Sequence, residues 1–172
     1  MHDSVDAMVA AWHEEMPEIS GLVLEIARRA TRLHALLDAV LGGELAKLGL
    51  ARAEFEVLAT MRRTGTPYRA RPGALVTAEV TAAGGIHKLA DRMVAAGLLR
   101  AQDDPADGRN SWLELTEKGV RFSETAMRNV AGAHEALLLR LPKERARDLA
   151  DLLREVLLSL GAQAIDARGL RP

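Results

Sequence analysis

The chain has 172 residues, of which 48% are hydrophobic and only 3% aromatic, so any core is aliphatic and favours helices over a β-sandwich. It contains no cysteine, which excludes disulfides, thiolate metal sites and thiol redox chemistry. No apolar run reaches the roughly 20 residues of a membrane span, and the N-terminus has no signal-peptide pattern. The expected location is therefore cytoplasmic.

The net charge is -1, from 23 basic and 24 acidic residues, so overall charge does not by itself indicate a nucleic-acid partner. The distribution is more informative. Residues 61–121 carry ten Lys and Arg against seven Asp and Glu, a difference of +3. This local excess has the sign needed to meet phosphate, and a dimer would double it.

The first part of the chain predicts helices. Ser4 is expected to cap a short helix, and a long helix is expected to run from Ser20 to the stop at Gly42-Gly43. A third helix is predicted over about 51–63, and Gly and Pro mark 64–71 as a loop.

A helix-turn-helix is predicted next. Pro72 suits the first turn of a helix that runs to about Val80. Thr81 is the expected cap of a second helix, and Gly97 is expected to end it in a left-handed conformation. The second helix of such a motif is the one that enters a DNA groove.

A β-hairpin is predicted directly after the second helix. A strand over 98–101, a turn-rich polar loop over 103–111 and a returning strand over 112–115 give the order of a winged helix-turn-helix. The predicted fold class is mainly α, with a small β-wing and long dimerisation helices at both ends of the chain.

Two more helices are predicted at the C-terminal end. One begins at Thr116 and runs to about Leu139, and the last begins at Pro142 and carries a strong apolar face. A winged helix offers no apolar surface for these helices and the N-terminal ones to cover. Their apolar faces therefore favour a homodimer with interlocked ends. The predicted division is 1–50 for dimerisation and a ligand pocket, 51–119 for DNA binding, and 120–165 for further dimerisation.

The candidate DNA-binding residues lie on the second helix, at its entrance and in the wing loop. Side chains of the helix would act from the major groove, while glycine at its start lets the backbone approach phosphate. A wing arginine can enter the minor groove, with an aspartate orienting it. The alternative is an ordinary charged helix beside a solvated hairpin tip. The candidates are Thr81, Gly84, His87, Lys88, Arg92, Asp107, Arg109 and Arg71.

No residue pattern predicts catalysis, a metal or a cofactor. The five histidines lack metal-ligand spacing, and no nucleophile motif or nucleotide fingerprint is present. His34 and His13 could meet in a pocket, although an ordinary partly buried histidine is the simpler interpretation.

The stretch from Phe55 to Gly119 closely resembles the MarR family of transcription regulators. The aspartate–arginine wing followed by Leu-Thr-x-x-Gly is the most specific part, and Trp12 and Pro17 resemble the PecS branch, which has an extra N-terminal helix. The residues that carry the resemblance are Phe55–Thr60, Pro72–Leu75, Gly84-Gly85, Asp91-Arg92, Ala96–Leu98, Asp104–Asp107, Arg109 and Leu115–Gly119.

The resemblance implies a homodimer that represses, less often activates, neighbouring genes and leaves a pseudo-palindromic DNA site when a small molecule binds. Urate-responsive members of the PecS branch use a tryptophan, an acidic residue and two arginines. Trp12 and Glu56 stand at the first two places, but Leu89 and Ala101 stand where the arginines would be. The effector is therefore expected to be less anionic or more apolar than urate, or absent, with Trp12, Glu56 and His34 as the candidate ligand-binding residues.

Two other functions fit parts of the sequence. A winged helix without DNA binding, used as a protein-interaction module, agrees with the near-neutral charge. A small hydrolase or isomerase is the third reading, and the absence of any nucleophile–base pair argues against it.

Overall fold

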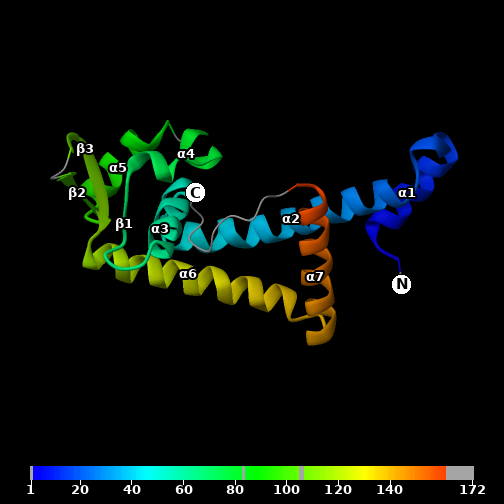
Figure 1. Cartoon of the computed structure of the whole chain (residues 1–172). Coiled ribbons are helices and arrows are strands. Elements are labelled where there is room, and N and C mark those ends of the chain that lie inside the picture. Colours follow the sequence, from blue (N-terminus) through cyan, green and yellow to red (C-terminus); the bar gives the residue numbers. More distant parts are fainter. Residues whose placement is uncertain (1, 83, 105–106, 162–172) are drawn as a thin grey trace. The chain divides into compact units, whose positions relative to one another are not determined.

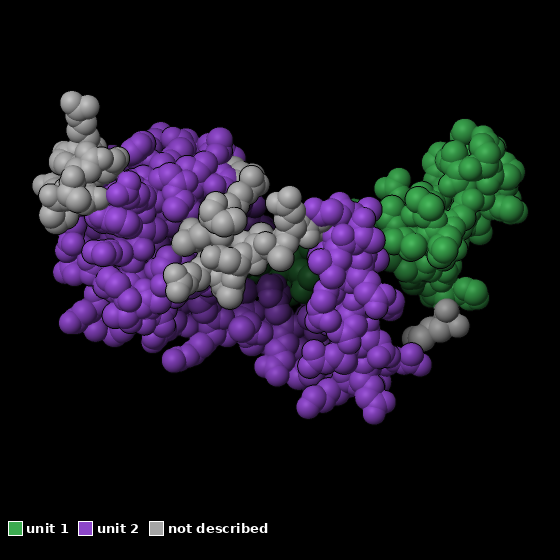
Figure 2. Space-filling model, in the orientation of Figure 1, with its two compact units in different colours: residues 1–41 green, residues 42–172 purple. Residues whose placement is uncertain are grey.

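The structure is a computed structural model that describes residues 2–82, 84–104 and 107–161, apart from the side chains of 78 and 103–110. The chain forms two compact units, residues 1–41 and residues 42–172 (Figure 2).

The first unit holds helix α1 (Ser4–Glu15), the short 3-10 turn η1 (Pro17–Ile19) and most of helix α2 (Leu22–Lys47). Helix α1 is capped by Asp3 and not, as expected, by Ser4. The Asp3 carboxylate accepts the backbone N–H groups of Val5 and Asp6 at 2.8 and 3.0 Å, and the Asp6 carboxylate accepts the N–H of Asp3 at 2.6 Å. This reciprocal capping box starts the helix one residue earlier than a serine cap would.

Helix α2 does not end at Gly42 and Gly43, so the predicted stop is wrong. The helix continues through both glycines to Lys47, and the chain turns at Gly49, whose φ is 61°. A glycine inside a helix costs only about 1 kcal/mol relative to alanine. Two glycines therefore cost about 2 kcal/mol, and burial of Leu45, which is 3% exposed, on the following turn contributes about as much.

The second unit begins with helix α3 (Arg52–Arg63), close to the predicted 51–63. The predicted helix from Pro72 to Val80 is instead a 3-10 turn, η2 (Pro72–Leu75), followed by the short helix α4 (Ala78–Ala82). Pro72 does occupy the first turn, as expected, but only of η2. Extended backbone at Val76, with ψ 113°, separates the two pieces.

Helix α5 (Ile86–Ala95) is the second helix of the motif, and Thr81 does not cap it. Thr81 lies inside α4, where its hydroxyl donates to the carbonyl of Thr77 at 2.8 Å. Gly85 is the N-cap of α5 and has a φ of 88°, a conformation that side-chain-bearing residues rarely adopt.

The wing is a three-stranded antiparallel sheet in the order β1-β3-β2 (Figure 1). Strands β2 (Leu99–Asp104) and β3 (Asp107–Leu115) are longer than predicted. The two-residue strand β1 (Arg69–Ala70) lies in the segment expected to be a loop and pairs with Leu113 and Glu114. A strand of two residues is too short to show an alternating sequence pattern. It forms because β3 supplies its hydrogen-bond partners.

The last two helices are α6 (Glu117–Leu138) and α7 (Lys143–Ser159), as the sequence predicts. Helix α3 packs on α4, α5 and α6, and α5 packs on β2. The core among these elements is aliphatic, and the mainly α winged helix-turn-helix is confirmed. The fully buried large side chains of this core include Leu58, Met61, Leu75, Val80, Leu89, Met93 and Leu99.

Candidate nucleic-acid interface

Helix α5 separates its apolar and polar side chains cleanly. Ile86, Leu89 and Met93 are buried in the core, at the spacing of one helix face. Lys88 and Arg92 are exposed four residues apart and therefore share a face, and His87 is exposed beside Lys88. The core thus fixes which residues of α5 remain available to a ligand outside the protein.

The entrance to α5 leaves polar backbone accessible. Gly84 is exposed, and a methyl group added to it would lie 3.4 Å from Cδ of Lys88. The Lys88 side chain therefore folds back over the first turn of the helix, where unpaired N–H groups attract anions. Thr81 is also exposed, on the preceding helix α4.

The end of α5 is tied to the start of α6 by the Leu-Thr-x-x-Gly segment. The Thr116 hydroxyl donates to the carbonyl of Gly97 at 2.7 Å and accepts the N–H of Gly119 at 3.0 Å. The Thr116 N–H donates to the carbonyl of Leu98 at 3.1 Å, and Lys118 Nζ reaches the carbonyl of Ala96 at 2.7 Å. We call these four hydrogen bonds the α5–α6 clasp.

Glycine at position 119 is required by the clasp. A methyl group there would overlap the carbonyl oxygen of Leu98 and lie 3.3 Å from the Leu115 side chain. Gly97, with a φ of 71°, ends α5 as the sequence predicts, and the N–H of Leu98 returns to the carbonyl of Met93 at 2.9 Å. The signature Leu-Thr-x-x-Gly therefore has a structural role.

Arg92 is held from the side by helix α3. Its Nε lies 3.8 Å from the carboxylate of Glu54, which also accepts the N–H of Ala51 at 3.0 Å and so caps α3. The Arg92 side chain remains 46% exposed. It is oriented by this contact but still accessible to a phosphate or a base.

The wing places Asp107 and Arg109 on the backbone of β3, and their side chains lie outside the described part of the chain. Arg71 is exposed at the N-cap of η2. Its guanidinium carbon lies 5.0 Å from the Trp112 ring centroid, and that of Arg69 lies 4.9 Å from the same ring. The sequence predicted Arg71 as a DNA contact but did not reveal the aromatic ring that it shares with Arg69.

Arg62, near the end of α3, turns inward. Its guanidinium donates to Glu124 of α6 at 2.9 Å and lies 4.3 Å from the ring of Tyr68. A hydrogen bond with Thr66, and then the Arg62 guanidinium, lower the pKa of Tyr68 from its usual 10.0. Arg62 therefore connects α3 to α6 and does not point to solvent as a phosphate contact would.

The chain is similar in sequence and in structure to known transcriptional regulators. No family model matches the chain. Over 152 residues, 88% of this chain and 92% of the relative, it is 27% identical to the HTH-type transcriptional regulator PecS of Dickeya dadantii. This relative and the solved structures support a transcriptional regulator of the MarR family.

Solved structures of MarR regulators have the same fold. Wild-type MarR of E. coli in its apo form superposes with a TM-score of 0.63 at 25% identity, covering 76% of this chain and 95% of that one. A MarR mutant from E. coli complexed with operator DNA gives a TM-score of 0.60 at 24% identity, covering 85% and 97%. At 85% of this chain, the matched length exceeds that of the winged helix alone.

Leu89 and Ala101 stand where arginines are expected in urate-responsive members of the PecS branch. The two residues differ in their burial. Leu89 is completely buried in the core, so this position does not face DNA. Ala101 is exposed on β2 opposite Leu113. Filling the core with Leu89 stabilises the winged helix and leaves no cation at that point.

The candidate effector residues belong to different units. Trp12, which is 37% exposed, and His34, also exposed, lie in the first unit, and Glu56 lies half-buried in the second. His13 does not bond His34. Its Nδ1 lies 2.9 Å from Oγ of Ser20. A pocket that uses Trp12, Glu56 and His34 remains a prediction.

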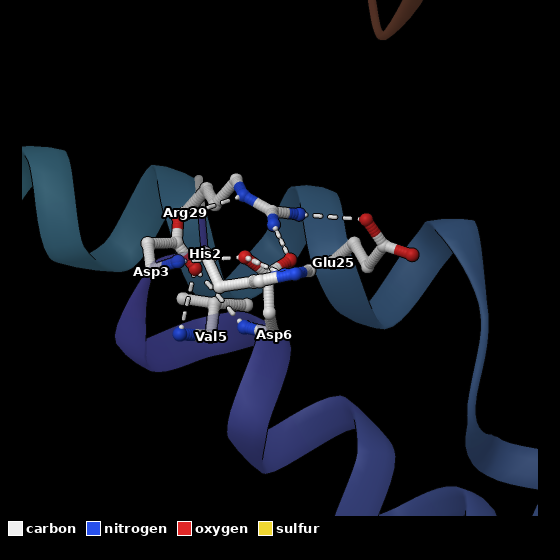
Figure 3. Close-up of polar contacts among 6 residues, drawn as sticks. All are labelled: His2, Asp3, Val5, Asp6, Glu25 and Arg29. Atoms are coloured by element: carbon white, nitrogen blue, oxygen red, sulfur yellow. Dashed lines mark hydrogen bonds and ion pairs between the residues drawn. The ribbon is translucent and has the colours of Figure 1, made fainter.

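Arg29 fastens α1 to α2 within the first unit (Figure 3). Its guanidinium donates to Asp3 at 3.1 Å, to Asp6 at 2.6 Å and to Glu25 at 2.7 Å. The pKa of Asp3 is lowered, first by the hydrogen bond from the Asp6 N–H and further by Arg29. Beside this cluster lies an open hollow of about 800 Å³, lined in part by His2, His13, Pro17 and Glu25.

Within the described part of the chain, no helix combines the length and the apolar character that crossing a membrane requires.

Proposed function

We propose that this protein is a sequence-specific DNA-binding transcriptional regulator of the cytoplasm, most simply a repressor, that acts as a homodimer and leaves its operator when a small molecule binds. The observation that carries the proposal is the division of α5. One side of the helix is locked into the core, and the other presents His87, Lys88 and Arg92 to solvent. A helix held in this way can enter a major groove without rearranging.

The wing and the entrance of α5 supply the remaining proposed contacts. Arg109 would enter the minor groove with Asp107 beside it, and Arg71 would meet a backbone phosphate. Thr81 and Gly84 are both exposed at the approach to α5. The Thr81 hydroxyl would turn from the Thr77 carbonyl to donate to phosphate, and glycine at position 84 would let a phosphate come close to the first turn of α5. Two solved MarR relatives, from E. coli and Streptomyces coelicolor, are complexes with DNA, which supports this assignment.

A homodimer explains the apolar surface of α7. Leu153, Val156 and Leu157 are 43%, 46% and 56% exposed, and with Leu152 and Leu160 they form an apolar face on this helix. Burying such a face in a second copy would remove it from water. Two winged helices would then meet half-sites one helical turn apart.

The effector is proposed to act at Trp12, Glu56 and His34. With no arginine at positions 89 and 101, a ligand less anionic than urate is the better match. A ligand that changed the separation of the two reading heads would lower affinity, because both heads must dock together.

The test is fluorescence anisotropy of the purified protein on the DNA upstream of its own gene, at two salt concentrations, with scrambled DNA as the control. We expect tight binding that prefers the upstream DNA and weakens steeply with salt. Arg109→Ala is expected to weaken binding while the circular dichroism and the dimer mass stay unchanged.

Two results would count against the proposal. If neither the upstream DNA nor any sequence selected from random DNA binds better than scrambled DNA, the protein-interaction module becomes the better description. If Arg109→Ala binds as tightly as the wild type, the wing is not a contact.

A further inference from the structure

Tyr68 has an unusual backbone conformation at the point where the chain enters the wing. Among the described residues it alone has a positive φ, of 57°, without being a glycine. In this left-handed conformation the Cβ atom crowds the following carbonyl oxygen, so a tyrosine adopts it only where surrounding contacts hold it there. Strand β1 begins at the next residue, so the conformation of Tyr68 sets the direction in which β1 enters the sheet.

Backbone and side-chain contacts both hold Tyr68 in place. Its N–H donates to the carbonyl of Gly65 at 2.6 Å, and its carbonyl accepts the N–H of Leu115 on β3 at 3.1 Å. Its hydroxyl bonds with Thr66, and its ring lies against Arg62, with the guanidinium carbon 4.3 Å from the ring centroid. The ring contact therefore connects Tyr68 to helix α3, and the bond with Leu115 connects it to the wing sheet.

The position of Arg62 depends in turn on helix α6. Nη2 of Arg62 donates to the carboxylate of Glu124 at 2.9 Å, across the contact of α3 with α6 (Figure 1). The Arg62 side chain is only 24% exposed, and its Nη1 is buried with no hydrogen-bond partner among the described residues. Without Glu124 the guanidinium would be a largely buried cation that has lost its carboxylate, so it would turn toward water.

We propose that Arg62, Tyr68 and Glu124 form a joint, which we call the wing joint, through which α6 controls the docking of β1 on the wing sheet. While Glu124 holds Arg62, the guanidinium covers the Tyr68 ring and maintains the left-handed backbone. When α6 moves away from α3, Arg62 leaves the ring, Tyr68 relaxes to a negative φ and its carbonyl releases Leu115. Strand β1 has only two residues, so little else keeps it on the sheet.

The wing joint differs from the α5–α6 clasp in what it responds to. The clasp holds the start of α6, at Thr116, whereas Glu124 lies about two turns further along the same helix. A tilt of α6 about its clasped start therefore separates Glu124 from α3 while the clasp stays closed. Release of β1 would free the backbone that leads into η2 and the helix-turn-helix. The proposal concerns the order of the wing sheet and does not depend on DNA binding.

Amide hydrogen exchange of the full-length protein, followed by NMR, tests the wing joint with two neighbouring reporters. The Leu115 N–H donates to the carbonyl of Tyr68, whereas the Thr116 N–H donates to the carbonyl of Leu98 in the clasp. In Glu124→Gln we expect Leu115 to exchange about fivefold faster, the effect of one partly exposed charge-assisted hydrogen bond. Thr116 is expected to change by less than about twofold, because a local opening leaves the clasp closed.

Two further variants separate the wing joint from general loosening. Glu135→Gln removes one exposed carboxylate from the same helix and is expected to leave Leu115 exchange unchanged. Tyr68→Gly adopts the left-handed backbone without strain, so β1 no longer needs Arg62 to hold it. In the Tyr68→Gly background, adding Glu124→Gln is therefore expected to change Leu115 exchange by less than about twofold.

Three results would overturn the proposal. The first is equal acceleration of Leu115 and Thr116 in Glu124→Gln, which would mean opening of the whole domain without a local release. The second is Leu115 exchange that Glu124→Gln leaves unchanged, or that Glu135→Gln accelerates as much. The third is an effect of Glu124→Gln that is equally large with and without Tyr68→Gly. The first two comparisons leave Tyr68 in place, so they decide the matter even if Tyr68→Gly does not fold.

Discussion

The carboxylate of Glu54 lies 3.8 Å from Nε of Arg92 while it also accepts the backbone N–H of Ala51. One side chain of α3 therefore caps its own helix and orients a polar residue of α5. If Arg92 meets DNA, it must leave Glu54 or share it.

The first prediction concerns this shared carboxylate. Glu54→Gln keeps an oxygen for the Ala51 N–H but removes the charge beside Arg92. We expect DNA affinity to rise about two- to fivefold, the range set by a partly exposed ion pair. Anisotropy titrations measure it, with Glu155→Gln on α7 as the control for one lost negative charge. Unchanged or weaker binding of Glu54→Gln would show that Arg92 does not exchange Glu54 for DNA.

The second prediction compares two glycines of helix α6. At Gly119 a methyl group would overlap the carbonyl of Leu98, whereas at Gly132 nothing lies within 4 Å. Gly119→Ala is expected to lower the free energy of unfolding by about 3 kcal/mol. Gly132→Ala is expected to raise it by about 0.5–1 kcal/mol through helix propensity. Denaturant unfolding of both variants measures the contrast, and effects of the same sign would contradict the clasp.

The third prediction is a pH dependence at the N-terminal cap. The pKa of the Asp3 carboxyl is lowered from its usual 3.8, first by the Asp6 N–H and further by Arg29. Since the folded pKa lies below the unfolded one, the stabilisation by Asp3 is present above the unfolded pKa and is lost as pH falls through the folded pKa. We expect α1 to loosen in acid below about pH 4.

Carbon NMR of the Asp3 carboxyl measures this shift directly. Its titration midpoint is expected below 3.8 in the wild type and closer to 3.8 in Arg29→Gln. The backbone N–H of Asp6 keeps part of the shift in that variant. A wild-type midpoint at or above 3.8 would contradict the capping geometry.

The fourth prediction uses the single tyrosine of the chain. A hydrogen bond with Thr66, and then Arg62, lower the pKa of Tyr68 from 10.0, so its phenolate should form at lower pH than a free tyrosine. Arg62→Met is expected to raise the midpoint of the ultraviolet titration. The same change is expected to cost about 1–3 kcal/mol of stability, because it leaves Glu124 without its hydrogen bond from Arg62.

Arg63 provides the control for Arg62. It is the next residue of α3 and is exposed, and its guanidinium bonds only the nearby Thr60 hydroxyl at 3.0 Å among the described contacts. Arg63→Met is expected to change stability by less than about 0.5 kcal/mol and to leave the tyrosine titration in place. Equal effects from the two variants would mean that Arg62 is an ordinary surface residue.

The sequence predicted the elements whose signals are local. The apolar spacing of α3, α5, α6 and α7, the proline at the start of η2 and the left-handed glycine after α5 all fall near their predicted places. Helix ends were harder to predict where two groups compete. Asp3 and Ser4 are both good caps, and only the reciprocal bond from Asp6 decides between them.

Features that depend on distant partners could not be predicted. Strand β1 exists because β3 pairs with it, and the aromatic contact of Arg69 and Arg71 follows from that register. Thr81 was predicted to be a cap because it precedes a helix. The turn before that helix is formed instead by Gly84 and Gly85, which both have a positive φ. The inward turn of Arg62 depends on Glu124, 62 positions later in the chain.

The α5–α6 clasp has a mechanical consequence. Three of its hydrogen bonds join the end of α5 to the start of α6, and the fourth caps α6, so the two helix ends are held together. Helix α6 has 22 residues and is therefore about 33 Å long at 1.5 Å per residue. Rotation by about 10° about its clasped end would move the far end by about 6 Å on this length. Conversely, a displacement of the far end of α6 would rotate α5 with it, because the clasp joins the two helices.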